Sequence, residues 1–155
     1  MKPFCCQVLI NGDLEIPCHK PPAEQIILAI VEPVVDRVIV IENKVIVRGH
    51  LDIRIEYVAD VNDCSQPVHF VHYAIQYNCL IDYPCLKDCT EVRVFPEIEY
   101  KEFCLVDKRT ISKLIVVKIC VERKHEEPVN NYHPKFPCFG SFPARSRAFQ
   151  RFLFF

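Results

Sequence analysis

The chain has 155 residues, of which half are apolar, and a formal net charge of −1 at pH 7. This length suits one domain with a sizeable core, and the near-neutral charge gives no overall attraction to nucleic acid. No window approaches the roughly 18 consecutive apolar residues of a membrane-spanning helix. The sequence therefore predicts a protein whose partners include neither nucleic acid nor a membrane.

Residues 1–24 are predicted to form an extended connector arm. A short alternating run covers Gln7 to Ile10, and Asn11-Gly12 is a strong signal for a two-residue hairpin turn. A small hairpin or a bent extended segment is expected here. The first residues lack an apolar stretch followed by a small-residue cleavage site, so we expect synthesis without a signal peptide.

The most regular strand pattern runs from Lys44 to Asp60. One face is apolar and consists of Val45, Val47, Leu51, Ile53, Ile55 and Tyr57. The other face is polar and consists of Arg48, His50, Asp52, Arg54 and Glu56. This two-residue period predicts a strand with one buried face. Gly49, at an inward position, predicts a bend or bulge where another strand packs closely.

Other alternating or β-branched runs predict further strands, at residues 7–10, 26–31, 34–41, 68–79, 92–100 and 115–122. Pro33 separates two of these runs, and Pro96 assigns its own run to a sheet edge or a bulge. No helical period is evident. The fold predicted for residues 25–126 is all-β, an antiparallel and jelly-roll-like β-sandwich of about seven to eight strands.

Residues 127–155 are predicted to be a separate C-terminal extension. From Pro128 onward it contains four prolines, seven phenylalanines and four lysines or arginines, with no acidic residue. The final RSRAFQRFLFF suggests nucleic-acid or membrane binding, but three arginines are a small electrostatic footprint, and interleaved phenylalanines are more typical of packing or strand addition. We therefore expect this end to be buried, against its own domain or a neighbouring subunit.

Ten cysteines conflict with synthesis in a reducing cytosol. The conflict disappears if the cell is later lysed and its assemblies are exposed to air. Cys5 and Cys6 are neighbours whose Cα atoms lie only about 3.8 Å apart across a trans peptide, so a bond between them would be strained. On an extended arm their side chains point in opposite directions, so they should reach two different partners.

The acceptor cysteines are expected on or near the sandwich. Cys120 lies between Lys118 and Glu122, on the face opposite the apolar set, and is the first candidate; Cys104 and Cys138 follow. An equally weighted alternative is that Cys104 and Cys120 are small buried apolar residues. The connectivity does not follow from the sequence.

The remaining cysteines are Cys64, Cys79, Cys85 and Cys89, for which we expect local disulfides or free thiols. The alternative of a zinc site is weaker, because only the spacing from Cys85 to Cys89 fits a paired zinc knuckle. No metal ligand is therefore assigned.

No constellation in the sequence indicates catalysis. His50, His69 and His72 are expected on solvent-facing strand positions or in local hydrogen bonds. A Gly-rich phosphate loop and a strand-turn-helix nucleophile are both missing from the sequence. We expect no enzymatic activity, no catalytic residue and no cofactor.

Three separated stretches occur in the order found in one known family: KVIVRGHLDIRIEYVAD, QPVHFVHYAIQY and VFPEIEYKEFCLVDKRTISKLIVVKICVERK. On these stretches, residues 26–124 resemble the SPOCS domain, a β-rich module of bacterial spore envelope proteins. The resemblance implies a structural or scaffolding role in the spore coat or exosporium, with no enzymatic activity known for the module. Many relatives also carry a LysM domain, for which this chain has no room.

The arm is similar to a second family, the subunits of endospore appendages called Ena fibres. In their N-terminal connector, a hydrophobic residue precedes a Cys-Cys pair, and a further cysteine follows ten to twelve residues later. Phe4, Cys5-Cys6 and Cys18 fit this pattern, with eleven residues between Cys6 and Cys18. The folded domain, however, resembles SPOCS more than the usual appendage subunit.

Together these features predict a structural subunit that forms a homopolymer on the spore surface, as a fibre, helical filament or appendage made in the mother cell. Inter-subunit disulfides are expected from Cys5, Cys6, Cys18, Cys104, Cys120 and Cys138. The alternative is a coat or exosporium scaffold or adaptor that recruits other coat proteins without forming regular fibres. A metal-binding or redox enzyme is a third interpretation, based on cysteine and histidine counts alone.

Overall fold

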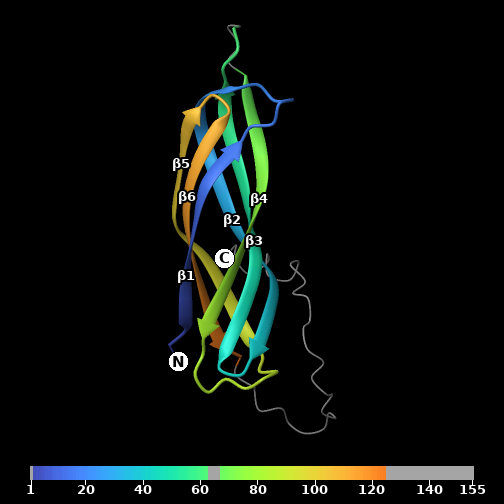
Figure 1. Cartoon of the computed structure of the whole chain (residues 1–155), viewed down its shortest axis with the longest axis vertical. Coiled ribbons are helices and arrows are strands. Elements are labelled where there is room, and N and C mark those ends of the chain that lie inside the picture. The colour runs from blue at the N-terminus through green and yellow to red at the C-terminus, as the bar shows by residue number, and fades with distance from the viewer. Residues whose placement is uncertain (1, 63–66, 125–155) are drawn as a thin grey trace.

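A computed structural model describes residues 2–62 and 67–124 of the chain. Its strands are β1 (Phe4–Glu15), β2 (Ala23–Ile41), β3 (Lys44–Ala59), β4 (Val68–Asp82), β5 (Val92–Asp107) and β6 (Thr110–Arg123). They form two three-stranded antiparallel sheets, in the orders β1-β6-β5 and β2-β3-β4. The sheets pack face to face as an elongated sandwich (Figure 1). No helix of the described residues could span a membrane.

The all-β antiparallel sandwich is confirmed, but the described residues form six strands, fewer than the predicted seven to eight. The two runs separated by Pro33 are one 19-residue strand, β2. A proline is tolerated there because β2 is a sheet edge, where a missing backbone N–H need not break a ladder hydrogen bond. Of the two forms expected for the first residues, the hairpin at Asn11-Gly12 is wrong and an extended segment is found, since β1 pairs with β6 continuously through both residues.

The segment predicted as a connector arm thus supplies the first strand of the sandwich. All of β1 is paired, from Phe4 opposite Val121 to Glu15 opposite Thr110. Its inward side chains, including Val8 and Ile10, pack against the core. This burial explains why the arm lies on its own domain. The predicted C-terminal extension, residues 127–155, lies outside the described residues.

The core lies between the two central strands, β3 and β6. Every apolar residue predicted to face inward from Lys44 to Asp60 is buried, and Tyr57 and Leu51 are among the largest fully buried side chains. On the other sheet, the buried side chains of β6 are Ile111, Lys113, Ile115, Val117, Ile119 and Val121. Each central strand therefore contributes one face to a single core, and these faces are apolar except for Lys113.

Gly49 marks a close approach between strands, as its inward position predicted. A Cβ atom there would overlap the carbonyl oxygen of Val34 on β2 and the hydroxyl of Tyr77 on β4. The Tyr77 hydroxyl donates a 2.9 Å hydrogen bond to that same carbonyl. The β2–β3 register also shifts between Val35 and Arg37, next to Gly49. Because Gly49 of β3 has no side chain, Tyr77 of β4 can reach across it to the Val34 carbonyl of β2.

The edge strands of the two sheets face each other on both sides of the sandwich, β1 beside β4 and β2 beside β5. Lys101 of β5 donates from Nζ to the Ala29 carbonyl of β2 at 2.7 Å, and the Tyr73 hydroxyl of β4 donates to the Glu15 carbonyl of β1 at 2.8 Å. The prediction that Pro96 marks an edge strand is confirmed, because β5 ends its sheet and is bulged between Ile98 and Tyr100.

Replacing Gly49 by alanine should lower the free energy of unfolding by about 2–4 kcal/mol, because the new methyl group overpacks the site and displaces the Tyr77 hydroxyl from its acceptor. Denaturant unfolding of the purified variant measures this. Adding Tyr77→Phe to Gly49→Ala should restore little, since the Val34 carbonyl still blocks the methyl group. Full recovery in the double variant would mean that the tyrosine hydroxyl is the sole obstacle.

The buried tyrosines predict a loss of stability at high pH. Burial, with a smaller contribution from nearby Asp36, raises the pKa of Tyr77 to about 12. Between pH 10 and 12 the unfolded chain releases this proton while the folded chain retains it, so the free energy of unfolding falls as the pH rises. Tyr77→Phe should make this fall shallower in unfolding titrations from pH 9 to 12. Equal slopes for the two proteins would contradict the assignment.

Candidate cross-linking site

Alternation along β1 places its two adjacent cysteines on different faces. Cys5 points to the outer face of the sandwich with Gln7 and Leu9, whereas Cys6 points inward with Phe4. The inward side chains need burial, which sets the face of every residue on the strand. The opposite directions of the two thiols follow directly from this register.

Cys5 is bonded to Cys120 on the neighbouring strand, β6. The two residues are directly opposite in the β1–β6 ladder, and their Cα atoms lie 4.0 Å apart. Cys120 is half-buried on the outer face, so its predicted position opposite the apolar set is confirmed and the alternative of a fully buried apolar residue is wrong. This bond fastens β1 within its own sheet.

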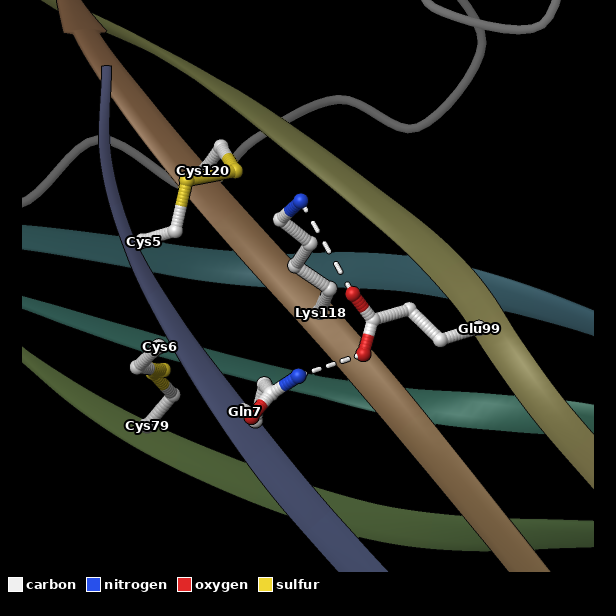
Figure 2. Close-up of a disulfide and its surroundings, with 7 residues drawn as sticks. All are labelled: Cys5, Cys6, Gln7, Cys79, Glu99, Lys118 and Cys120. Carbon is white, nitrogen blue, oxygen red and sulfur yellow. Dashed lines mark hydrogen bonds and ion pairs between the residues drawn. A yellow bond between two sulfur atoms is a disulfide. The ribbon is translucent and has the colours of Figure 1, made fainter. Parts of the chain in front are cut away.

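Cys6 is bonded to Cys79 of β4, in the other sheet. Their Cα atoms lie 6.9 Å apart, and Cys79 is buried among the core side chains. Figure 2 shows the two bonds leaving β1 in different directions, one to β6 and the other to β4. The second bond therefore connects the two layers of the sandwich.

Polar and aromatic contacts hold the strand around these bonds. Gln7 donates from Nε2 to Glu99 of β5 at 2.6 Å, and Lys118 of β6 lies 3.7 Å from the same carboxylate (Figure 2). On the inner side, the rings of Phe4 and Tyr83 have centroids 4.3 Å apart. These contacts hold β1 in the register that places each cysteine beside its partner.

The adjacent cysteines have two different partners, as the alternation predicts, but both partners belong to the same chain. The sequence predicts bonds to other subunits from three of these residues, Cys5, Cys6 and Cys120. In the structure their sulfur atoms are already bonded within one chain. Cys79 was expected in a local disulfide or free, and its bond instead spans 73 residues of sequence. The alternation along the strand could have shown that Cys79 faces the core, because Cys79 continues the inward series of Val71 and Tyr77, but it does not identify the partner.

The other predicted cysteines are spread over the surface. Cys18 lies between β1 and β2, Cys85 and Cys89 lie between β4 and β5, and Cys104 is on β5; all four are exposed. Cys18, Cys85 and Cys104 are outside the disulfides of the described chain. The structure brings none of these three to the β1 site. The two others, Cys64 and Cys138, lie outside the described residues.

The alternative zinc set loses one member, since the sulfur of Cys79 is bonded to Cys6. Within residues 2–62 and 67–124, no three metal-ligating side chains come together. His50 lies 2.8 Å from Asp36 through Nδ1, in a local contact of the kind predicted for it. His69 and His72 lie beside the aromatic rings of Tyr57 and Phe70. The chemistry available at β1 is therefore thiol–disulfide chemistry.

The sequence model of one protein family, described as SipL, SPOCS domain, matches residues 22–106, more than half of the chain. No curated protein and no solved structure matches the chain. The family match covers β2, β3, β4 and nearly all of β5. It includes Cys79 but neither β1 nor β6, so both disulfides involve strands beyond the matched segment. The similarity of the first residues to an appendage connector stays a prediction.

Replacing Cys6 by serine should lower the free energy of unfolding of the oxidised protein by about 2–4 kcal/mol, because a long loop is no longer closed in the unfolded chain. Denaturant unfolding with and without a thiol reductant measures the difference. The matched control is Cys104→Ser, which removes an exposed thiol and should change nothing. An equal loss under reducing conditions would assign the effect to packing.

Proposed function

The chain belongs to the SPOCS-domain family, which is associated with bacterial spores, and on this premise we propose that it is a structural subunit that self-assembles into a disulfide-cross-linked fibre on the spore surface. The observation that carries the proposal is the double attachment of β1, bonded through Cys5 to one sheet and through Cys6 to the other. Because β1 forms both bonds, it covalently joins the chain that supplies the strand to the domain that receives it.

Exchange of β1 between subunits would turn this connector into an inter-subunit link. An edge strand that makes its contacts in its own domain makes the same contacts in the domain of an identical neighbour. Because Cys79 and Cys120 lie in one domain, the exchanged strand would bond to one neighbour, not to two. Repeated head to tail without closing, such an exchange produces a filament.

Exposed thiols offer an alternative route to covalent links, in place of the exchanged strand. The connection from β1 to β2 lies at one end of the sandwich and the connection from β4 to β5 lies at the other (Figure 1). The first connection contains Cys18 and the second contains Cys85, and both thiols are exposed. Thiols at both ends of an elongated subunit suit end-to-end bonding after oxidation. The similarity of Phe4, Cys5-Cys6 and Cys18 to an appendage connector supports the same proposal.

The second candidate function is a coat or exosporium scaffold or adaptor that recruits other coat proteins. The observation in its favour is that both disulfides close within one chain. A domain whose β1 pairs and forms its disulfides within the same chain needs no neighbour to fold. Such a protein would be oxidised and monomeric, or cross-linked irregularly through exposed thiols.

Non-reducing and reducing gels, combined with electron microscopy of the oxidised protein, test these candidates. The fibre proposal predicts regular filaments and a covalent ladder that the reductant removes. Cys5→Ser with Cys6→Ser should abolish the ladder, because the exchanged strand loses both bonds. The matched variant, Cys18→Ser with Cys85→Ser and Cys104→Ser, should retain it.

The reverse outcome would assign the links to the exposed thiols. Oxidised monomers without filaments would overturn the fibre proposal in favour of the adaptor. Disulfide mapping of a mixture of isotopically heavy and light chains separates the two states of β1, since an exchanged strand gives mixed pairs of Cys5 with Cys120.

A further inference from the structure

An apolar strip crosses the outer face of the β1-β6-β5 sheet. Leu9, Val116 and Tyr100 are aligned across the three strands, and Leu114 lies two residues from Val116 on the same face. Leu9 is 62% exposed, Tyr100 49% and Leu114 36%. The outer face of an antiparallel sandwich is normally polar. A row of large apolar side chains across three strands therefore indicates a surface that is covered.

The bulge in β5 adds carboxylates to this strip. It lies between Ile98 and Tyr100, so Glu99 and Tyr100 are both exposed although they are adjacent. Glu97 and Glu102 are exposed on the same strand, and Glu102 accepts a 2.7 Å hydrogen bond from the Tyr100 hydroxyl. The strip is therefore bordered by three carboxylates.

Few cations balance these carboxylates. Lys118 is paired with Glu99 (Figure 2), whereas Lys101 donates to a β2 carbonyl in the other sheet. Lys118 lies opposite Glu97 in the β5–β6 ladder but makes its ion pair with Glu99, so within residues 2–62 and 67–124 neither Glu97 nor Glu102 is in an ion pair. Both carboxylates can therefore accept a basic partner. The surface has the chemistry to bind a segment rich in apolar and aromatic side chains, with arginine or lysine at its margins.

The chain itself contains such a segment. Residues 128–155 have seven phenylalanines, and their charged side chains are Lys135, Arg145, Arg147 and Arg151. The described chain ends at Lys124, whose backbone N–H donates to the Glu91 carbonyl at the start of β5. The described part of the chain therefore ends on the sheet that carries the strip.

Its length is also sufficient. From Lys124 back to the level of Val116 is eight residues of strand, about 26 Å at 3.3 Å per residue. Residues 125–148, which precede the final phenylalanines, can span more than about 70 Å when extended. A segment tethered this closely has a high effective concentration at the strip, which favours its own sheet over that of another copy.

We propose that residues 128–155 bind the apolar strip of their own chain, with phenylalanine side chains on Leu9, Val116 and Tyr100 and arginines opposite Glu97 and Glu102. The proposal goes beyond fibre formation and does not depend on it. It assigns the outer face of the β1-β6-β5 sheet to an internal partner, so contacts between subunits would use other surfaces.

Site-specific photo-cross-linking tests the proposal on the full chain. A benzophenone amino acid at position 100 should form cross-links to peptides from residues 145–155. The matched control is the same group at position 70, because Phe70 is an aromatic residue of the other sheet with a similar exposure, 46%. It should give no such cross-link.

Mixing heavy and light isotopic forms before irradiation distinguishes one chain from two. Cross-links within one isotopic form support the proposal. Mixed cross-links would overturn it in favour of binding between copies. Products without any peptide from residues 128–155 would also overturn it.

Hydrogen exchange gives a second measurement that needs no bulky substitution. Glu97→Gln with Glu102→Gln removes two weak charge pairs, which should accelerate amide exchange in residues 145–155 by roughly five-fold. The matched control is Glu32→Gln with Asp52→Asn, two opposed carboxylates on the other sheet, and should leave exchange unchanged. Equal exchange rates in the first variant and the unmodified protein would contradict the arginine contacts.

Discussion

Successive residues on an extended strand point to opposite faces, and this constraint governs the cross-links of the molecule. Once Phe4, Val8 and Ile10 are buried, Cys6 must face the core and Cys5 must face outward. In this domain Cys6 then bonds across the core to Cys79, and Cys5 bonds along the outer face to Cys120. A strand of twelve residues is thereby fastened to both layers without any turn or helix to redirect its side chains.

The same constraint explains how much of the fold could be predicted from the sequence. The face of each residue in Lys44–Asp60 follows from its period of two, and Gly49 signals the close approach of Tyr77 because it interrupts an apolar series. The number of strands was more difficult to predict. Pro33 suggests the end of a strand, but it lies on the edge strand β2, where a proline is tolerated and the strand continues. The Asn11-Gly12 pair has the local preference for a turn, but pairing with β6 on both sides keeps it extended.

Disulfide partners required information that local patterns do not contain. Parity places Cys6 and Cys79 on inward faces, but it does not say that β1 and β4 face each other across the core. That neighbourhood depends on the pairing of β1 with β6, two strands separated by nearly the whole domain. The sequence pattern also does not distinguish a bond within one chain from a bond between two chains, because an exchanged strand has the same local contacts as a retained one.

The position of the family match gives these bonds a particular meaning. The matched residues 22–106 contain one complete sheet and most of β5. The second sheet is completed by β1, which precedes the match in the sequence, and by β6, which follows it. Cys5, Cys6 and Cys120 all come from these two completing strands. Oxidation therefore fixes the flanking strands to each other and to the matched segment.

If subunits assemble by exchange of β1, as proposed above, the two disulfides determine the order of the steps. While the thiols are reduced, β1 is held by an edge ladder and side-chain packing, and such an edge can open locally at less cost than a central strand. After oxidation, release of the strand requires two bonds to be broken, so the arrangement becomes kinetically fixed. Any exchange of β1 between subunits must accordingly precede oxidation. Under the proposed function, synthesis in a reducing cell followed by exposure to an oxidising exterior would supply these two stages in the required order.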